Sequence, residues 1–365
     1  MTMKNVLLDA AELRQFVARI FIKAGCSQTE SELVARLLVE SNLAGHDSHG
    51  VIRVPRYVSM LRDELIFADR KVELLVDTPA LAVVDGKYGF GQTVALQATQ
   101  IGIEKCRQSG LSAVALRNAG HIGRVADWAE MAAAAGLVSV HFVNGAGSVL
   151  VAPFGSLERR FSTAPYCVGV PVRDAPPLIL DFATSIVAEG KVLVASQGGK
   201  QLRPDALVGP DGKAGNDPHL LYGDYEPTGM RDPRVGPGAI RAFGEHKGSG
   251  LAMMCELLGG ALTGNGCTEW GRRFTNGMFS IYVDPARVDP EQLFPAEVSR
   301  YVNFVKQAKP LEPGTETMVP GEPETRSREQ RLRGGVPLSM HTWQSIVETA
   351  ASLGIDNMPV GKPQT

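Results

Sequence analysis

The sequence predicts an α/β protein, and three observations support this fold class. Strand-like and helix-like segments alternate between residues 80 and 144, which is typical of sheets covered by helices. The chain has 365 residues, of which 44% are hydrophobic and 21% charged, enough apolar material for a large core. The glycine-rich stretches GFGQTV, GAGSVL and GSGLAM each lack the third glycine of G-x-G-x-x-G, so we expect no ordinary Rossmann dinucleotide site.

Residues 9–64 are predicted to be helical. In DAAELRQFVARIFIKAGC the apolar residues recur at the spacing of one helix face, and Gly25 is a plausible stop signal. The following SQTESELVARLLVESNLAG begins with the capping residues Ser27 and Thr29 and has acidic residues in its first turn.

The alternating part of the chain follows. Strands are expected at 80–86, 111–118, 137–144, 178–182 and 277–284, and helices at 91–110, 124–136, 246–263 and 338–354. Residues 198–240 are rich in Gly, Pro and Asp and should be mostly loop.

Charge and cysteine content limit the class of partner and the compartment. The net charge is −2, from 37 basic and 39 acidic residues, so no basic field favours a nucleic acid or a membrane surface. The five cysteines are scattered without a C-x-x-C pair, which indicates a reducing compartment. Residues 131–157 lack charged side chains but are interrupted by glycines and a proline, so they indicate a buried strand and a loop. We therefore expect a soluble cytoplasmic protein.

The stretch NLAGHDSHGVIRVPRY, residues 42–57, concentrates functional side chains. His46 and His49 have no nearby partners at metal-ligand spacing, so no metal site is expected. Ser48 beside His49 lacks the surroundings of a catalytic nucleophile, because neighbouring side chains usually point apart.

An anion clamp is the stronger interpretation of this stretch. If residues 48–62 are helical, His49, Arg53 and Arg56 share one face; alternatively, 48–54 is a loop that enters a helix at Pro55. Gly50 would leave space for a ligand beside His49. An arginine can bind a carboxylate with two parallel hydrogen bonds. A capped surface helix with solvated arginines remains an equal alternative.

NAGHIGRVADW, residues 118–128, places His121 directly after a predicted strand. Loops at strand ends are common positions for functional sites. Gly120 and Gly123 flank the histidine and should leave it accessible, and an imidazole suits general acid/base chemistry. The alternative is a histidine that caps the next helix.

Three further segments carry polar groups near predicted element ends. LILDFATS ends a strand at Asp181, where a carboxylate could bind a ribose or cap a helix. FGEHKGSGLA places His246 and Lys247 at a helix N-terminus, which favours phosphate. VPGEPE, residues 319–324, is a proline-framed turn with two carboxylates.

Taken together, these segments resemble the malate/L-lactate dehydrogenase family, the nicotinamide-dependent 2-hydroxyacid oxidoreductases that lack the Rossmann fold. The resemblance covers nearly the whole chain. It is carried by GHDSHGVIRVPRY, VDGKYGFGQ, NAGHIGR, VAPFG, LDFATS, EHKGSGLAMMCELLGGALTGN, VPGEPETRSRE and GGVPL. The segments AGHDSHG, HIGR and EHKG are most similar in sequence to those of the family branch whose members act on 2-oxo and 2-hydroxy acids.

The resemblance implies a fold and an assembly. It implies a family-specific, non-Rossmann nucleotide-binding α/β domain at 76–300. Residues 1–75 would form a helical part, and residues 301–365 would pack with those N-terminal helices. It also implies a homodimer with sites near the subunit interface.

The resemblance further implies the site residues and a bound NAD or NADP. His121 would be the proton donor or acceptor, and His49 would lie at the nicotinamide and substrate end. From the anion-clamp interpretation we add the hypothesis that Arg53 holds the substrate carboxylate. The cofactor would be lined by His49, Gly123, Arg124, Val125, Asp181, Phe182, Ala183, His246, Asn276, Gly321, Glu322, Pro323 and Glu324.

The implied reaction interconverts small-molecule 2-oxo and 2-hydroxy acids. One turn departs from the family pattern: relatives carry G-T-N-P near 162–165, whereas this chain has Ser162 for the glycine and Ala164 for the asparagine. The change leaves open a reductase of a cyclic imine carboxylate, a ureidoglycolate-type dehydrogenase, or a weakened binding protein.

Overall fold

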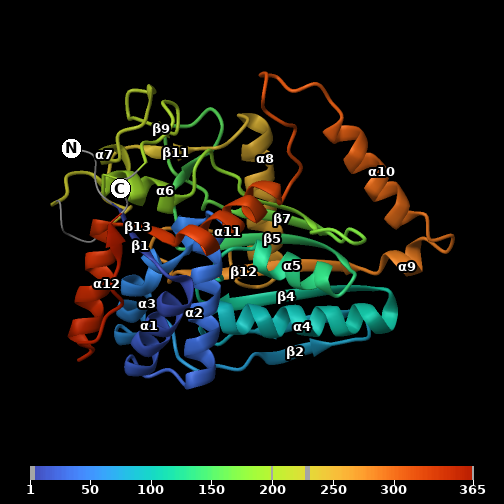
Figure 1. Cartoon of the computed structure of the whole chain (residues 1–365), viewed down its shortest axis with the longest axis horizontal. Coiled ribbons are helices and arrows are strands. Elements are labelled where there is room, and N and C mark those ends of the chain that lie inside the picture. The colour runs from blue at the N-terminus through green and yellow to red at the C-terminus, as the bar shows by residue number, and fades with distance from the viewer. Residues whose placement is uncertain (1–4, 199, 227–230, 364–365) are drawn as a thin grey trace.

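The computed structural model describes residues 5–198, 200–226 and 231–363, and a seven-stranded mixed sheet lies at its centre (Figure 1). The strand order is β2 (Glu73–Asp77), β3 (Leu81–Asp85), β4 (Leu111–Ala119), β12 (Thr275–Val283), β5 (Val138–Ala146), β7 (Pro165–Val170) and β8 (Leu178–Ala183). Only β3 and β4 pair in parallel; the other pairs are antiparallel. The α/β class is therefore confirmed, and this sheet is not the parallel sheet of a Rossmann fold.

Helices cover both faces of this sheet. On one face, α4 (Gly91–Ser109) and α5 (Ala126–Ala134) pack into a core that includes Val143 of β5. The adjacent Phe142 points to the other face, where it packs near α8 (His246–Cys255). Successive side chains of a strand alternate between faces, so the two helix layers must be on opposite sides. The predicted helix at 246–263 is continuous, but it changes to a π-helix, η3 (Glu256–Leu262).

A smaller lobe carries a second sheet in the order β10 (Ala214–Gly215), β9 (Leu207–Val208), β11 (Ala239–Arg241) and β6 (Val151–Ala152). Two short helices, α6 (Glu189–Ser196) and α7 (His219–Tyr222), pack with it around an apolar cluster. The described part of 198–240 is mostly loop, as predicted.

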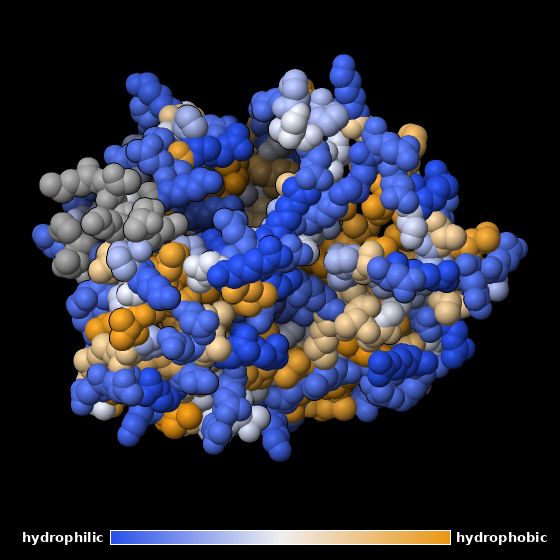
Figure 2. Space-filling model, in the orientation of Figure 1, coloured by the Kyte–Doolittle hydropathy of each residue, from blue (hydrophilic) through white to orange (hydrophobic). Residues whose placement is uncertain are grey.

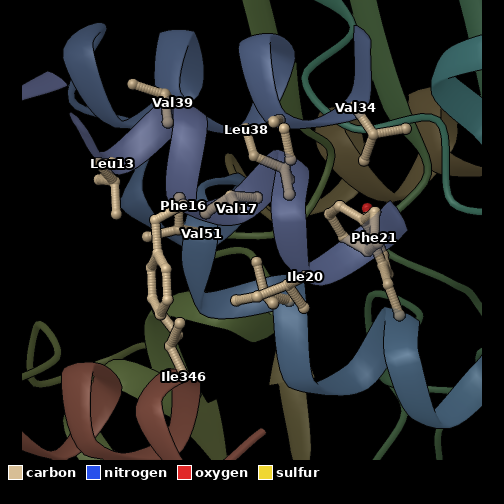
Figure 3. Close-up of a cluster of buried hydrophobic side chains, with 14 of the residues drawn as sticks. Leu13, Phe16, Val17, Ile20, Phe21, Val34, Leu38, Val39, Val51 and Ile346 are labelled. Atoms are coloured by element: carbon tan, nitrogen blue, oxygen red, sulfur yellow. The ribbon is translucent and has the colours of Figure 1, made fainter. Parts of the chain in front are cut away.

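Both chain ends contribute to a helical part with its own core. It contains α1 (Ala10–Lys23), α2 (Gln28–Leu43), α3 (Val54–Arg62) and α12 (Met340–Ser352). A small sheet joins β13 (Val336–Ser339), β1 (Asn5–Leu8) and β14 (Lys362–Pro363). In Figure 3, Phe16 of α1 points to Ile346 of α12, and Leu38 and Val39 of α2 belong to the same cluster. The expected domain boundaries at residues 75 and 300 lie inside β2 and inside a helix, α10 (Phe294–Lys306).

An arm follows the last central strand and projects from the body (Figure 1). It contains α9 (Pro285–Val288) and α10 (Phe294–Lys306), and no residue of either helix is buried. The chain then returns through α11 (Glu322–Gly334), so the expected GEPE turn is in fact the start of a helix. Figure 2 shows a mainly hydrophilic face that is hollowed between the smaller lobe and the arm. No helix in the described part of the chain is long and apolar enough to cross a membrane.

Candidate active site

Residues 46–53 form two consecutive 3-10 turns, η1 (Asp47–His49) and η2 (Val51–Arg53), before α3 begins. The interpretation of 48–62 as one helix is therefore wrong, and a loop that enters a helix is right. Arg56 is exposed and does not share a face with His49. Pro55 lies in the first turn of α3, where its missing N–H leaves no hydrogen bond unmade.

Asn42 at the end of α2 holds this segment in place. Its Oδ1 accepts a hydrogen bond from the Val51 N–H at 2.8 Å, and its Nδ2 donates to Asp47 Oδ1 at 2.6 Å. A Cβ atom on Gly50 would lie 2.2 Å from Asn42 Oδ1. Gly50 is thus needed for packing against Asn42, and the expectation that it leaves space for a ligand is wrong.

His121 is bound by a tyrosine that the sequence did not single out. Its Nδ1 lies 2.6 Å from the hydroxyl of Tyr57, and that hydroxyl accepts a hydrogen bond from Gln92 Nε2 at 3.1 Å. Because a tyrosine oxygen can accept two hydrogen bonds, the hydroxyl can take one from Gln92 and one from an Nδ1–H of His121. In that tautomer Nε2 of the neutral ring carries no proton and can accept one from a substrate.

His49 and His121 stack with ring centroids 5.6 Å apart and planes at 14°. Phe274 approaches the other side of the pair, 6.3 Å from the His121 ring. Burial, followed by the charge of Arg53, lowers the pKa of His121 to about 3. Burial likewise lowers the pKa of His49 well below its ordinary value. Both imidazoles are therefore neutral at neutral pH.

Arg53 lies beside the histidine pair and is held by two partners. Its Nε donates to the Ser48 carbonyl oxygen at 2.7 Å. Nη1 and Nη2 both point to Oε2 of Glu189, at 3.4 and 3.3 Å. The other oxygen of Glu189 accepts a hydrogen bond from the Tyr222 hydroxyl at 2.7 Å. The guanidinium is thus oriented by the smaller lobe.

The loop after β4 is fixed by packing and by Asn276. The Asn276 Oδ1 accepts from the Ile122 N–H at 3.0 Å, and its Nδ2 donates to the Asn144 carbonyl at 2.7 Å. A Cβ on Gly120 would lie 2.7 Å from the Gly89 carbonyl oxygen, so Gly120 permits close packing rather than ligand access. The sequence prediction that His121 follows a strand end is confirmed.

A cavity of about 330 Å³ lies next to this loop, between α5, β8 and the start of α11. Its polar lining includes His46, Arg124, Asp181 and Glu324, and its apolar wall comes from alanines of α5 and the prolines of residues 171–177. Burial raises the pKa of Asp181 above its ordinary value. A hydrogen bond from His46 lowers the pKa of Glu324.

Two chain segments connect the cavity to the histidine pair. One runs from His46 in the cavity lining to His49 in the stack, and the other runs from His121 to Arg124. The cavity and the histidine pair are therefore neighbours along these two segments, although neither His49 nor His121 is among the residues that line the cavity. Four of the predicted cofactor residues line this cavity: Arg124, Asp181, Gly321 and Glu324.

Arg124 is 2% exposed, and its guanidinium is bound by the carboxylates of Asp127 and Glu130. Those contacts satisfy most of its donors, so the side chain mainly supports the cavity wall. Burial raises the pKa of the Asp127 carboxyl to about 6. Among the residues that the structure describes, no group of three or more His, Cys, Asp or Glu side chains could hold a metal ion.

The remaining predicted residues are not among those that line this cavity. Gly123 has a φ of +76° and Val125 precedes α5. Phe182 packs edge-on against Phe243, and Ala183 ends β8. The Glu322 carboxylate is paired with Lys306, and Pro323 is in the first turn of α11. His246 is exposed at the start of α8 beside Phe154.

Comparison with known proteins decides the family. The family model described as malate/L-lactate dehydrogenase matches residues 8–347. The chain belongs to the malate/L-lactate dehydrogenase family. It is therefore an enzyme, an oxidoreductase of the dehydrogenase class, and the resemblance seen in its motifs is confirmed.

Three relatives illustrate the range of the malate/L-lactate dehydrogenase family. Hydroxycarboxylate dehydrogenase B of Escherichia coli is 37% identical over 95% of this chain and 94% of its own length. Delta(1)-pyrroline-2-carboxylate/Delta(1)-piperideine-2-carboxylate reductase of Pseudomonas putida is 30% identical over 94% of this chain and 96% of its own. The solved malate dehydrogenase of Pyrococcus horikoshii superposes with a TM-score of 0.84 at 25% identity, covering 97% of both chains.

The turn that departs from the family pattern is built around a buried carboxylate. Glu256 Oε1 accepts from the backbone N–H and the hydroxyl of Ser162, at 3.1 and 2.6 Å, and from the Thr268 hydroxyl. Asn144 Nδ2 donates to its other oxygen. Ala164 is fully buried with a φ of +33°, a conformation that suits asparagine or glycine better. The serine thus adds a hydrogen bond, and the alanine keeps a strained backbone.

Sequence reasoning missed Tyr57, Gln92, Phe274, Glu189 and Tyr222 as site residues. Tyr57 is the last residue of the stretch NLAGHDSHGVIRVPRY. A tyrosine among the apolar residues of a helix suggests only a core residue. Glu189 and Tyr222 come from the smaller lobe, and no local pattern connects them with Arg53.

Proposed function

We propose that this dehydrogenase interconverts 2-oxo acids and 2-hydroxy acids, with His121 as the general acid/base. The observation that carries the proposal is the arrangement of His121, stacked on His49, hydrogen-bonded to Tyr57 and next to the guanidinium of Arg53. It combines a proton-transfer group with a carboxylate-binding group, which are the two groups such a substrate requires.

The residues of the cavity fit a nicotinamide dinucleotide, NAD or NADP. The flat apolar wall suits an aromatic base, and the carboxylates of Asp181 and Glu324 can accept hydrogen bonds from ribose hydroxyls. Gly321 has a φ of +94°, and a Cβ there would lie 3.1 Å from the Pro177 carbonyl oxygen. When bound, the cofactor supplies or accepts the hydride.

We propose NAD as the preferred form of this cofactor. Asp181 and Glu324 carry negative charge into the cavity, while Arg124 is already bound by Asp127 and Glu130. A 2′-phosphate would meet these carboxylates, and both arginines of the lining, Arg124 and Arg328, already face other carboxylates. A ribose diol, in contrast, can donate to the two cavity carboxylates.

Within the site, the chain's own residues bind the substrate and move one proton. Arg53 holds the carboxylate, which places the keto oxygen near Nε2 of His121. Nε2 of the protonated His121 gives its proton to the oxygen as the carbon is reduced, which leaves a neutral ring whose Nδ1–H can donate to the Tyr57 hydroxyl. In the oxidation direction His121 receives the hydroxyl proton. Neutralisation of Arg53 by the bound carboxylate removes a charge that lowers the pKa of His121.

The experiment that tests this proposal follows NADH and NADPH oxidation by absorbance with a panel of 2-oxo acids and one cyclic imine carboxylate. We expect turnover of 2-oxo acids, with a higher kcat/KM for NADH than for NADPH. The relative from Pseudomonas putida and the altered turn at Ser162 favour cyclic imine reduction as the second candidate. Turnover of the imine alone would replace the proposed reaction with that one.

We also propose a homodimer in the cytoplasm. Leu293, Tyr301 and Phe304 of the arm are 59%, 58% and 64% exposed, a pattern that a second subunit would cover. All five cysteines are free, which suits a reducing compartment. Light scattering coupled to size-exclusion chromatography should give twice the mass of one chain; a monomer mass would reject the dimer.

A further inference from the structure

Glu189 occupies the binding face of Arg53 that a substrate carboxylate would need. A guanidinium can offer a carboxylate two hydrogen bonds either through Nε and one Nη or through both Nη atoms. Here Nε is used by the Ser48 carbonyl at 2.7 Å. Both Nη atoms point to a single oxygen of Glu189. Neither two-pronged face is therefore free.

Ser48 cannot easily give up its contact with Arg53. Its side chain is 6% exposed, and a Cβ on Gly190 would lie only 2.5 Å from Ser48 Cβ. The first turn of α6 and η1 thus pack in close contact. The short bond to the Ser48 carbonyl is part of this packing, and it fixes the guanidinium in one orientation.

Glu189 is the partner that can move. Its two contacts with Arg53 are long, at 3.3 and 3.4 Å, and both use the same oxygen. Its other oxygen is held at 2.7 Å by the hydroxyl of Tyr222, a side chain that is 2% exposed. A small rotation can therefore release Arg53 while the carboxylate keeps its hydrogen bond to Tyr222 and stays satisfied.

We propose that Glu189 is a specificity-determining residue: it holds the binding face of Arg53 as an internal carboxylate, and the carboxylate of a 2-oxo acid must displace it. This inference rests on the proposed function, because it assigns the substrate carboxylate to Arg53. Glu189 lowers the affinity for every carboxylate at this position, and it does not penalise a neutral ester of the same substrate. The exchange replaces one ion pair by another, so Arg53 never stays unpaired in a buried site.

The test compares pyruvate with methyl pyruvate in the wild type, Glu189→Gln and Glu189→Asp, each with NADH. The glutamine removes the competing charge, and the shorter aspartate withdraws it from Arg53. We expect KM for pyruvate to fall at least tenfold in Glu189→Gln and by less in Glu189→Asp, while KM for methyl pyruvate stays within twofold. Glu158→Gln is the control, because Glu158 is an exposed residue of another surface and the substitution makes the same change in net charge.

The opposite result would overturn the proposal. If KM rises for both pyruvate and methyl pyruvate, Glu189 only braces Arg53; if neither value changes, it does not compete. Oxamate binding to the NADH-loaded protein, measured by calorimetry, gives a readout that needs no turnover, and affinity should rise at least tenfold in Glu189→Gln. If the wild type reduces no 2-oxo acid, the proposed function is rejected. If the wild type reduces 2-oxo acids but the oxamate affinity of Glu189→Gln is unchanged, only the role of Glu189 is rejected.

Discussion

The hydroxyl of Tyr57 lies 2.6 Å from Nδ1 of His121 and connects the buried helical core to the proposed proton-transfer group. Tyr57 is 2% exposed and packs against Phe21 and Phe90. Its ring therefore cannot leave without disturbing that core, and its hydroxyl fixes the orientation of His121.

Tyr57→Phe should lower kcat about tenfold, because His121 loses the group that orients it. The hydroxyl also satisfies Gln92, so we expect a loss of about 1–3 kcal/mol in the free energy of unfolding. Steady-state kinetics and urea unfolding measure the two effects. Tyr301→Phe on the exposed arm is the control, and equal kinetics in both variants would remove Tyr57 from the mechanism.

Arg53→Lys should raise KM for 2-oxo acids at least tenfold, with a smaller change in kcat. One ammonium cannot both reach the Ser48 carbonyl and offer a two-pronged face to a carboxylate. Titration of the 2-oxo acid at saturating NADH measures this effect, with Arg62→Lys at the exposed end of α3 as the control. A change confined to the KM for NADH would show that Arg53 has been misassigned.

The pH dependence of 2-hydroxy acid oxidation follows from the pKa of His121. Since that pKa is lowered to about 3, the ring stays neutral and able to accept a proton throughout the neutral range. The base would be lost only as the pH falls toward 3. We expect kcat/KM to change less than threefold between pH 8 and pH 5, whereas an ordinary histidine would lose about thirtyfold at pH 5. A break near pH 6.5 would contradict the lowered pKa.

Gly190→Ala should affect both folding and substrate binding. The added Cβ would lie 2.5 Å from Ser48 Cβ and 2.9 Å from Arg53 Nη2, so α6 must move away from η1. We expect a destabilisation of about 1–3 kcal/mol and a raised KM for 2-oxo acids. Gly334→Ala, at the end of α11, has no heavy atom within 4 Å of the added Cβ and should be neutral or slightly stabilising. Similar unfolding curves for both variants would contradict the packing argument.

Much of the fold could be predicted because its signals are local. The side chains of Asp9 and Ser27 cap α1 and α2, and such capping residues can be recognised in a sequence. Strand-like runs between helical segments located β3, β4 and β5, and the end of β4 correctly placed His121. The arm helix α10 was missed, although its apolar residues recur at helical spacing, because none of them packs into the core of the same chain.

The parts of the site that could not be predicted depend on contacts between distant segments. Gly50 is constrained by the side chain of Asn42, and Arg53 is paired with Glu189, which is 136 residues away in sequence. Nothing in the local sequence distinguishes a packing glycine from one that admits a ligand. A lowered pKa is not specific either: burial also lowers the pKa of His141 to about 3, yet that residue only binds two serines inside the sheet.

The most direct test of the account is the kcat of His121→Ala with NADH and the best 2-oxo acid of the panel, measured together with NADH affinity. His219→Ala, an exposed histidine of the smaller lobe, is the control. We predict a loss of kcat of about 10² or more, because general acid catalysis contributes on this scale, while NADH affinity stays within about threefold of the wild type. A kcat within threefold of the wild type would contradict the assignment of His121 as the acid/base and with it the proposed mechanism.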